Sequence, residues 1–302
     1  MRSFTRLPLL LGLAFTATPV SAQTTYTWGQ NAGTAWATGG NWVGGTPAGS
    51  SSEATNNDIA QFGSGSTGTQ MQMNFGILGT PYYLGTVNIL STNTVAKTMG
   101  ANTATAGVVQ LNGTGANNLI LSNASTSLFT LAPLAGGSGT GMSLRLGAVS
   151  SEIAATGGIT ISAQIAEANA GSGITKTGTG SLTLSGANTF TGGVTLNAGT
   201  LSLGNNAALG TGALTVGAVG TAINVTGTAA TFANDINLTN TAGRVAFVTP
   251  NTSSTTLSGT ISGGAANTGI ATTTGTEWFF RGGASGQNTG ALTITGGGLF
   301  EL

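Results

Sequence analysis

Apolar residues along much of this chain come in pairs whose two members are separated by one polar residue. Such pairs are Leu182 and Leu184, Val194 and Leu196, Leu201 and Leu203, and Leu214 and Val216. An alternation with a period of two places the apolar side chains on one face of a β-strand. The residues between the pairs are rich in Gly and Asn, which are typical of tight turns. The pattern therefore predicts short strands joined by tight corners.

The pairs themselves recur at a longer and nearly regular interval. Leu182 is followed at this interval by Leu201, Val194 by Leu214, Leu201 by Ile223, Leu214 by Ile236, and upstream Val87 and Ile89 by Val109 and Leu111. A repeat of roughly 20 to 23 residues is the length of one coil of a β-solenoid, whose coils bury their apolar faces only by stacking. We therefore predict an all-β fold in which residues 69–302 form β-helix repeats, with room for roughly eleven coils.

Both ends of the predicted solenoid differ from its middle. Residues 23–68 contain Trp28, Trp36 and Trp42, three of the four tryptophans. Because an uncovered solenoid end invites edge pairing, we interpret this segment as an N-terminal cap, and a carbohydrate-binding platform is the alternative. At the other end, ALTITGGGLFEL looks like the start of another repeat copy, so we expect the repeat to be cut short at Leu302.

Residues 1–22 have the three parts of a secretory signal peptide. Arg2 and Arg6 precede an apolar run from 7 to 15, and Val20-Ser21-Ala22 forms a small-x-small cleavage site before Gln23. The apolar run is too short for a membrane-spanning helix, which needs about 20 residues. We expect the chain to be exported, with no membrane span in the mature protein.

The composition excludes several classes of function. Without Arg2 and Arg6 the chain has five basic and seven acidic residues, a net charge of about −2, so nucleic acid and anionic membranes are not expected partners. The absence of cysteine and histidine removes disulfides, thiolate and Ser-His-Asp catalysis, and nearly all zinc sites. The glycine-rich GSGSTG at 63–68 precedes a strand-like segment and not a helix, so no nucleotide site is predicted. We predict no cofactor, no metal site and no catalytic residue.

Carboxylates remain the one source of possible hydrolytic chemistry. The mature chain has Glu53, Asp58, Glu152, Glu167, Asp235, Glu277 and Glu301. A glycosidase needs two carboxyl groups roughly 5 to 10 Å apart, but these acids are scattered singly. We expect them to be solvated or structural.

The sequence EWFFR at 277–281 is a locally unusual cluster. Trp278, Phe279 and Phe280 cannot all face inward on one strand. The cluster is interpreted as a buried loop flap, and the alternative is a small sugar-stacking ligand surface made by these three aromatic residues and Arg281.

Residues 173–216, GITKTGTGSLTLSGANTFTGGVTLNAGTLSLGNNAALGTGALTV, closely resemble the autotransporter-associated β-strand repeat. The matching residues are Lys176, Gly178, Gly180, Leu182, Leu184, Gly186, Asn188, Thr189, Phe190, Thr191, Gly192 and Gly193, followed by Gly199, Thr200 and Leu201. The resemblance implies a right-handed parallel β-helix of the kind found in autotransporter passenger regions, and that repeat carries no catalytic residues to transfer. An autotransporter ends in a membrane barrel, which these 302 residues do not contain, so the resemblance places a translocator or anchor outside this chain or implies another route to the surface.

Two hypotheses about function follow. The first is a non-catalytic exported structural β-helix, a passenger-like surface stalk, coat or adhesin region, with host-surface, matrix or glycan ligands as partners. The second is a polysaccharide-active or glycan-binding β-helix that uses the dispersed acids and exposed tryptophans. Both place the protein outside the cell or at the outer-membrane surface of a Gram-negative-type bacterium.

Overall fold

The structure, a computed structural model, describes most of the chain from residue 23 onward. The described residues are 23–29, 35–52, 56–66, 69–73, 81–101, 107–115, 117–132, 142–218, 220–226, 230–239, 246–249, 254–263, 269–271, 277–279, 292–295 and 298–301. The predicted signal peptide lies outside them. The one helical element in the described ranges is the 3-10 turn η1 (Gly39–Asn41). No helix within these ranges has the length and hydropathy of a membrane span.

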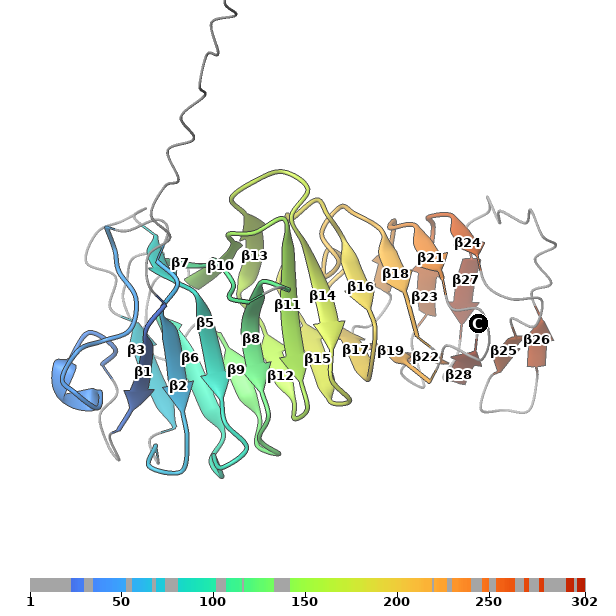
Figure 1. The fold of residues 1–302 in the computed structure, drawn as a ribbon. Helices are drawn as coiled ribbons and strands as arrows, with labels where there is room; N and C mark the ends of the chain where they lie inside the picture. Colours follow the sequence, from blue (N-terminus) through green and yellow to red (C-terminus); the bar gives the residue numbers. More distant parts are fainter. Residues whose placement is uncertain are drawn as a thin grey trace, which may run out of the picture.

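The described strands stack into long parallel sheets that form a β-helix (Figure 1). The longest sheet, in spatial order, is β1 (Thr25–Trp28), β2 (Ile59–Phe62), β5 (Thr86–Ile89), β8 (Leu119–Asn123), β11 (Ser150–Ala155), β14 (Gly173–Thr177), β16 (Val194–Leu196), β18 (Leu214–Val216), β21 (Ile236–Leu238) and β24 (Ile261–Gly263). All nine pairings within this sheet are parallel. This architecture confirms the predicted parallel β-helix.

A second sheet runs beside the first one, two smaller sheets follow along the third side, and a separate pair of strands lies at the C-terminal end (Figure 1). The second sheet is β3 (Gln70–Met73), β6 (Lys97–Ala101), β9 (Phe129–Leu131), β12 (Ile159–Ile161), β15 (Ser181–Leu184), β17 (Thr200–Leu203), β19 (Ala222–Val225), β22 (Ala246–Thr249) and β28 (Gly298–Glu301). The smaller sheets are β4 (Tyr82–Leu84), β7 (Gly107–Leu111), β10 (Met142–Leu146) and β13 (Gln164–Glu167); β20 (Ala230–Phe232), β23 (Ser254–Leu257) and β27 (Leu292–Thr295); and the pair β25 (Gly269–Ala271) and β26 (Glu277–Phe279).

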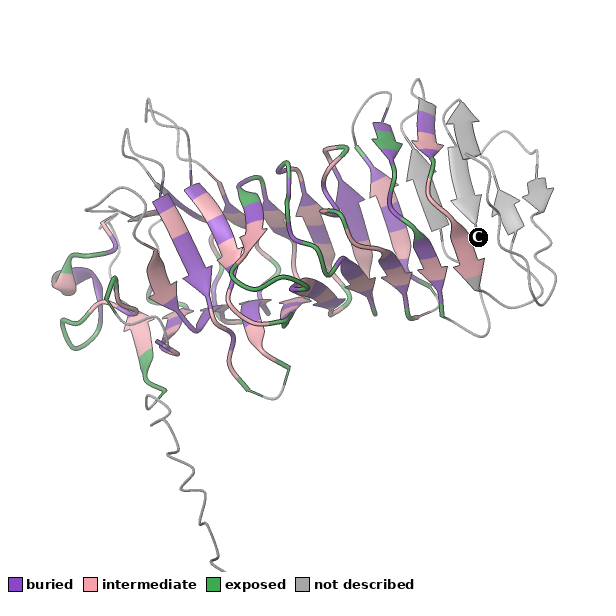
Figure 2. Cartoon of the chain, turned by 90° about the horizontal axis from the view of Figure 1, so that it is seen from above, coloured by how far each residue is buried: buried purple, intermediate pink, exposed green. Residues whose placement is uncertain are grey.

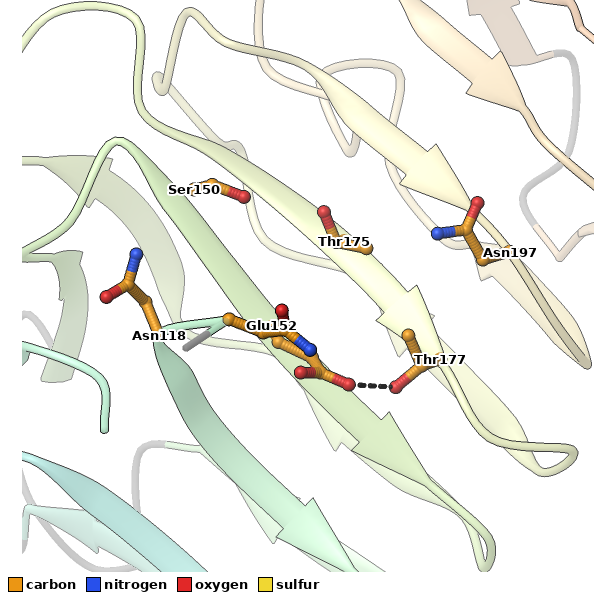
Figure 3. A pocket seen from close by; sticks show the side chains of 7 residues that line it. Asn118, Ser150, Glu152, Thr175, Thr177 and Asn197 are labelled. Atoms are coloured by element: carbon orange, nitrogen blue, oxygen red, sulfur yellow. Dashed lines mark hydrogen bonds between the residues drawn. The ribbon is translucent and has the colours of Figure 1, made fainter. Parts of the chain in front are cut away.

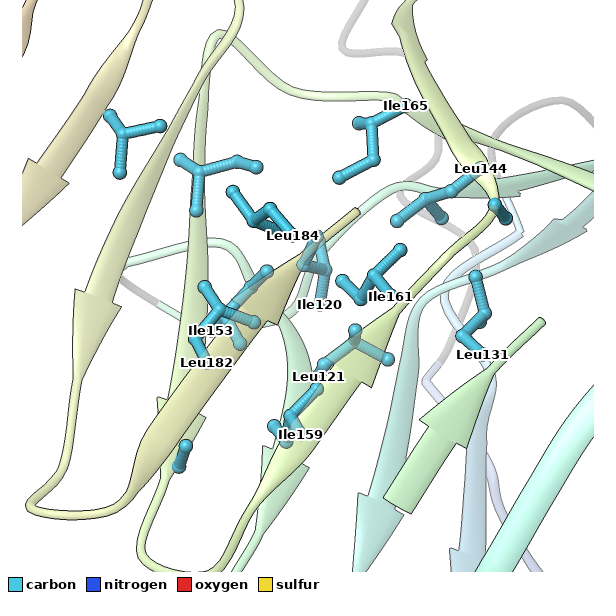
Figure 4. Close-up of a cluster of buried hydrophobic side chains, with 14 of the residues drawn as sticks. Ile120, Leu121, Leu131, Leu144, Ile153, Ile159, Ile161, Ile165, Leu182 and Leu184 are labelled. Carbon is cyan, nitrogen blue, oxygen red and sulfur yellow. The ribbon is translucent and has the colours of Figure 1, made fainter. Parts of the chain in front are cut away.

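The register between coils follows the sequence repeat in the middle of the chain. The structure pairs Leu182 with Leu201, Leu201 with Ile223, Val194 with Leu214, and Leu214 with Ile236. These apolar residues point inward and are at most 2% exposed, while the polar residues between them face outward (Figure 2). Figure 4 shows the resulting interior, where Leu182 and Leu184 lie beside Ile159 and Ile161 of the preceding coil. The predicted offsets over this region are therefore confirmed.

The offset predicted upstream is wrong. Val87 pairs with Leu121, and Val109 lies in a different sheet, where it pairs with Tyr82. Between β2 and β11 the connections between successive strands are longer, so one turn needs more residues there. The main sheet has eight described strands within residues 69–302, fewer than the roughly eleven coils expected.

Three motif residues of the best-matching repeat copy join adjacent coils or fill the core. Asn188 is buried and accepts a hydrogen bond from the Ile165 N–H of the preceding coil at 2.8 Å, and it donates to the Ala208 carbonyl of the next coil at 2.6 Å. Phe190 is fully buried and packs in the core, in a coil that has no third strand. Gly199 has a φ of +70°, and a Cβ there would lie 2.4 Å from the Gly180 carbonyl oxygen. The motif is therefore explained by contacts within and between coils.

Residues 35–50 cover the edge strands at the N-terminal end of all three sheets. The Val43 N–H donates to the Thr27 carbonyl on the free edge of β1. The Trp36 N–H donates to the Gln72 carbonyl on β3, and Ser50 and Tyr83 on β4 exchange two backbone hydrogen bonds. Because an unpaired edge strand is a template for association, this pairing protects the start of the helix.

The three tryptophans of this segment form one aromatic cluster with Phe62. Trp36 and Trp42 pack edge to face, with ring centroids 4.8 Å apart, and Trp28 lies 5.1 Å from Trp42. All three indole rings are at most 3% exposed. A sugar-stacking platform needs an exposed ring face, so the alternative assignment of these tryptophans to carbohydrate binding is wrong.

The last described strands do not continue the parallel repeat. β28 pairs antiparallel with β22, and β27 pairs antiparallel with β23. The described strands of ALTITGGGLFEL therefore do not continue the parallel pairing, and the expectation that the repeat is cut short at Leu302 stays a prediction. These strands double back onto the previous coil and pair with two of the three sides of the helix at its C-terminal end (Figure 1).

Candidate functional site

The predicted aromatic ligand surface lies largely outside the part of the chain that the structure describes. The backbones of Trp278 and Phe279 belong to β26, which pairs antiparallel with β25. Phe280 and Arg281 lie outside the described residues. The structure therefore does not test whether these four residues form a ligand surface, and that assignment stays a prediction.

Three of the described carboxylates are used in the fold. Asp58 accepts hydrogen bonds from the Gly49 N–H and the Asn56 side-chain amide, and Asp235 accepts one from the Thr260 N–H. Glu167 accepts hydrogen bonds from the backbone N–H groups of Ser172 and Thr191, together with one from the Thr191 hydroxyl. Among the described residues, no three His, Cys, Asp or Glu side chains gather as a metal site would require. Glu53 lies outside the described residues, and only the backbones of Glu277 and Glu301 are described.

Glu152 differs from these acids because it lies in a surface hollow. The hollow has a volume of about 260 Å³ and lies on the outer face of β8, β11, β14 and the end of β16. Its lining residues are Asn117, Asn118, Ser150, Glu152, Thr175, Thr177 and Asn197 (Figure 3). A second hollow of about 190 Å³ adjoins it, shares Ser150 and Thr175, and has Gly171, Gly173, Gly192 and Gly193 in its lining. We call the two hollows together the Glu152 groove.

A local break in the repeat borders the larger hollow of the Glu152 groove. β11 pairs with β8 in a register that shifts between Glu152 and Ile153, which leaves Ile120 of β8 as an extra residue in a β-bulge. Just before the bulge, Thr114 and Leu119 form an antiparallel bridge that closes a tight turn. Asn118 in this turn has a φ of +51°, the one positive φ among described residues other than glycine. The turn raises Asn117 and Asn118 as one wall of the groove.

The polar atoms of the Glu152 groove are only partly used by the fold. The Thr177 hydroxyl donates to one carboxylate oxygen of Glu152 at 2.6 Å. The second carboxylate oxygen makes no hydrogen bond with the described residues, and neither do the side chains of Asn118, Thr175 and Asn197. In Figure 3 these groups lie along the same outer face, across successive strands. The groove therefore offers a carboxylate, a hydroxyl and amide groups to a ligand.

The cation nearest in sequence points away from the groove. Lys176 lies between Thr175 and Thr177 on β14, but its side chain is directed into the interior and is completely buried. Its ammonium donates to the carbonyls of Thr177, Gly178 and Ala198 at 2.8, 2.7 and 3.1 Å. Burial lowers the pKa of Lys176 to about 8. Three carbonyls match the three donors of an ammonium group, so this lysine ties β14 to the next coil, a role that the motif alone does not reveal.

The second lysine of the chain is also buried. The ammonium of Lys97 on β6 donates to the Ser66 carbonyl of the preceding coil, and burial lowers its pKa. Both lysines thus act inside the fold and leave the outer face without their positive charge.

Comparison with known proteins supports the repeat assignment. Residues 174–203 match the family model of the passenger-associated-transport-repeat. No curated protein and no solved structure matches the chain. The match covers β14 to β17, the part of the helix that contains Lys176, Asn188 and the confirmed register. It identifies an autotransporter passenger-type repeat, which implies an exported bacterial surface protein.

Proposed function

We propose that this chain, which carries a passenger-type repeat, is a non-catalytic structural β-helix that projects from or coats a bacterial surface as a stalk, coat or adhesin region. The observation that carries the proposal is the unbroken ten-strand parallel sheet, whose strands stack through inward apolar ladders. At a strand spacing of about 4.8 Å, ten strands extend roughly 45 Å. Such a function depends on the shape of the protein, because the rod holds any attached segment at a fixed distance from the cell surface.

The covered N-terminal end supports this role. We propose that residues 23–68 act as a cap, since segment 35–50 pairs with the edges of β1, β3 and β4. A β-helix whose N-terminal edge is covered can add coils only at its other end. It does not associate end to end through the covered edge. In this proposal the signal peptide of residues 1–22 directs export, and a translocator or anchor lies outside this chain.

Polysaccharide hydrolysis receives less support than a structural role. The Glu152 groove contains one carboxylate, whereas glycoside hydrolysis ordinarily uses two that face each other across the bond. Asp58, Glu167 and Asp235 are occupied by backbone N–H groups elsewhere in the fold.

Protease treatment of intact producing cells tests the proposal. We expect the chain to be removed from the cell surface without lysis, and we expect the purified protein to show the scattering profile of a rod with no turnover of a panel of polysaccharides. Protection of the chain in intact cells, or steady release of reducing sugar that depends on Glu152, would refute the structural role.

A further inference from the structure

The Glu152 groove has no function in the structural role proposed above, yet it is the place where the helix departs from its repeat. The bulge at Ile120 and the left-handed Asn118 lie at the edge of its larger hollow. Bulges often redirect side chains beside binding sites, and a strained backbone is often found at them. The bulge is not needed for the stacking of coils, because the neighbouring coils stack without a bulge.

The chemistry of the groove selects among ligand classes. Its lining contains one carboxylate and no Lys or Arg, and Lys176 is bound to carbonyls in the interior. An anionic ligand would meet repulsion there without a compensating cation. The lining contains no aromatic ring, so it offers no stacking or cation–π surface. What remains is a set of hydroxyl, amide and carboxylate groups, which both accept and donate hydrogen bonds.

The shape of the groove indicates an extended ligand. The two hollows share Ser150 and Thr175, and together their linings reach from the turn before β8 to the start of β16. A chain-like molecule lying along the helix axis would contact one coil after another. The larger hollow, about 260 Å³, is slightly below the roughly 300 to 1,000 Å³ of common small-molecule sites.

We infer that the Glu152 groove binds an uncharged oligosaccharide. The free carboxylate oxygen of Glu152 accepts hydrogen bonds from sugar hydroxyls, and hydrogen bonds to a charged acceptor are stronger than neutral ones. Thr175 and Asn118 offer a hydroxyl and an amide to the same ligand. Binding by a single groove is weak because no ring stacks on the sugar, and the avidity increases when several copies of the groove bind together. The inference does not depend on the rod function, since either can hold without the other.

The test uses the complete chain on a densely printed glycan array that carries uncharged, sialylated, sulfated and free-amine glycans. The best uncharged glycan is then titrated by NMR against wild type and three variants. Glu152→Gln keeps the shape of the side chain and removes its charge, and Thr175→Ala removes a hydroxyl that makes no hydrogen bond in the fold. Thr215→Ala is the matched control, because Thr215 lies two strands further along the same outward row and outside both hollows.

We expect binding to uncharged glycans that weakens at least about tenfold in Glu152→Gln, weakens several-fold in Thr175→Ala and is unchanged in Thr215→Ala. Thermal unfolding of each variant shows whether the fold is retained, and Thr175→Ala carries the test if Glu152→Gln does not fold. Absence of binding, a preference for sialylated, sulfated or free-amine glycans, or binding that survives both groove substitutions would overturn the inference. None of these outcomes bears on surface exposure or rod shape, so they leave the structural role standing.

Discussion

Raising the pH should stabilise this protein through Lys176. Burial lowers the pKa of Lys176 to about 8 from 10.5 in the unfolded chain. Between these two values the unfolded state holds a proton that the folded state has lost, so the free energy of unfolding increases with pH. One pKa unit corresponds to about 1.4 kcal/mol, which gives a gain of roughly 2 to 3 kcal/mol between pH 7 and pH 10.

The Lys176→Met variant isolates this contribution. Methionine keeps an unbranched apolar side chain in the core but cannot titrate, so the pH-dependent gain should disappear. The other buried groups act equally in both proteins and cancel in the difference. Lys97 has a lowered pKa and adds stability with increasing pH, whereas burial raises the pKa of Tyr82, which opposes the gain above about pH 10.

The measurement is the free energy of unfolding of both proteins from urea titrations at pH 7, 8, 9 and 10, followed by far-UV circular dichroism. We expect the difference between wild type and Lys176→Met to change in favour of wild type by roughly 2 to 3 kcal/mol over this range. A difference that stays constant from pH 7 to pH 10 would refute the reasoning, because it would mean that the pKa of Lys176 is the same in the folded and unfolded chain.

Three further predictions concern the repeat, the cap and the signal peptide. Asn188→Ala should lower the free energy of unfolding by about 2 to 3 kcal/mol in a denaturant titration, because it leaves the buried Ile165 N–H without its partner, whereas the exposed Asn197→Ala should change it by less than about 0.5 kcal/mol. Trp42→Ala should lower the free energy of unfolding by about 3 to 5 kcal/mol, because it removes an indole whose ring centroid lies 4.8 Å from that of Trp36. It should also increase self-association in sedimentation velocity, because the edge strands lose their cover. A variant that stays a stable monomer would contradict the role of this segment as a cap. N-terminal sequencing of the exported protein should begin at Gln23, and an intact Met1 would contradict the signal peptide.

The sequence predicts the fold best where its copies are most alike. From Leu182 to Leu238 the apolar pairs recur at intervals that match the observed register, because a coil of fixed length places equivalent residues one above another. Upstream, the interval between Val87 and Val109 matches the repeat length only by coincidence. The coils there have longer connections between their strands, and such connections leave no periodic signal in the sequence.

The Glu152 groove could not be predicted in the same way. It depends on a register shift in β8 and on a left-handed Asn118, and both are deviations from the pattern on which the sequence analysis relies. Glu152 itself looks like any of the seven scattered acids. Its position opposite Thr175 becomes visible only once the strands are aligned. The burial of the three tryptophans likewise follows from edge pairing by residues 35–50, which composition alone does not indicate.

The central claim is that successive coils stack in register along one axis, and paired spin labels measure this directly. The outward row Thr98, Thr130, Thr160, Thr183, Ser202 and Asn224 runs across six strands of the second sheet. The chain has no cysteine, so Thr98→Cys or Thr130→Cys combined with Asn224→Cys gives two specific label pairs. The β-helix predicts backbone separations of about 24 and 19 Å, five and four strand spacings. Narrow distance distributions that differ by about one strand spacing would agree with the account, and broad distributions or equal distances for the two pairs would contradict it.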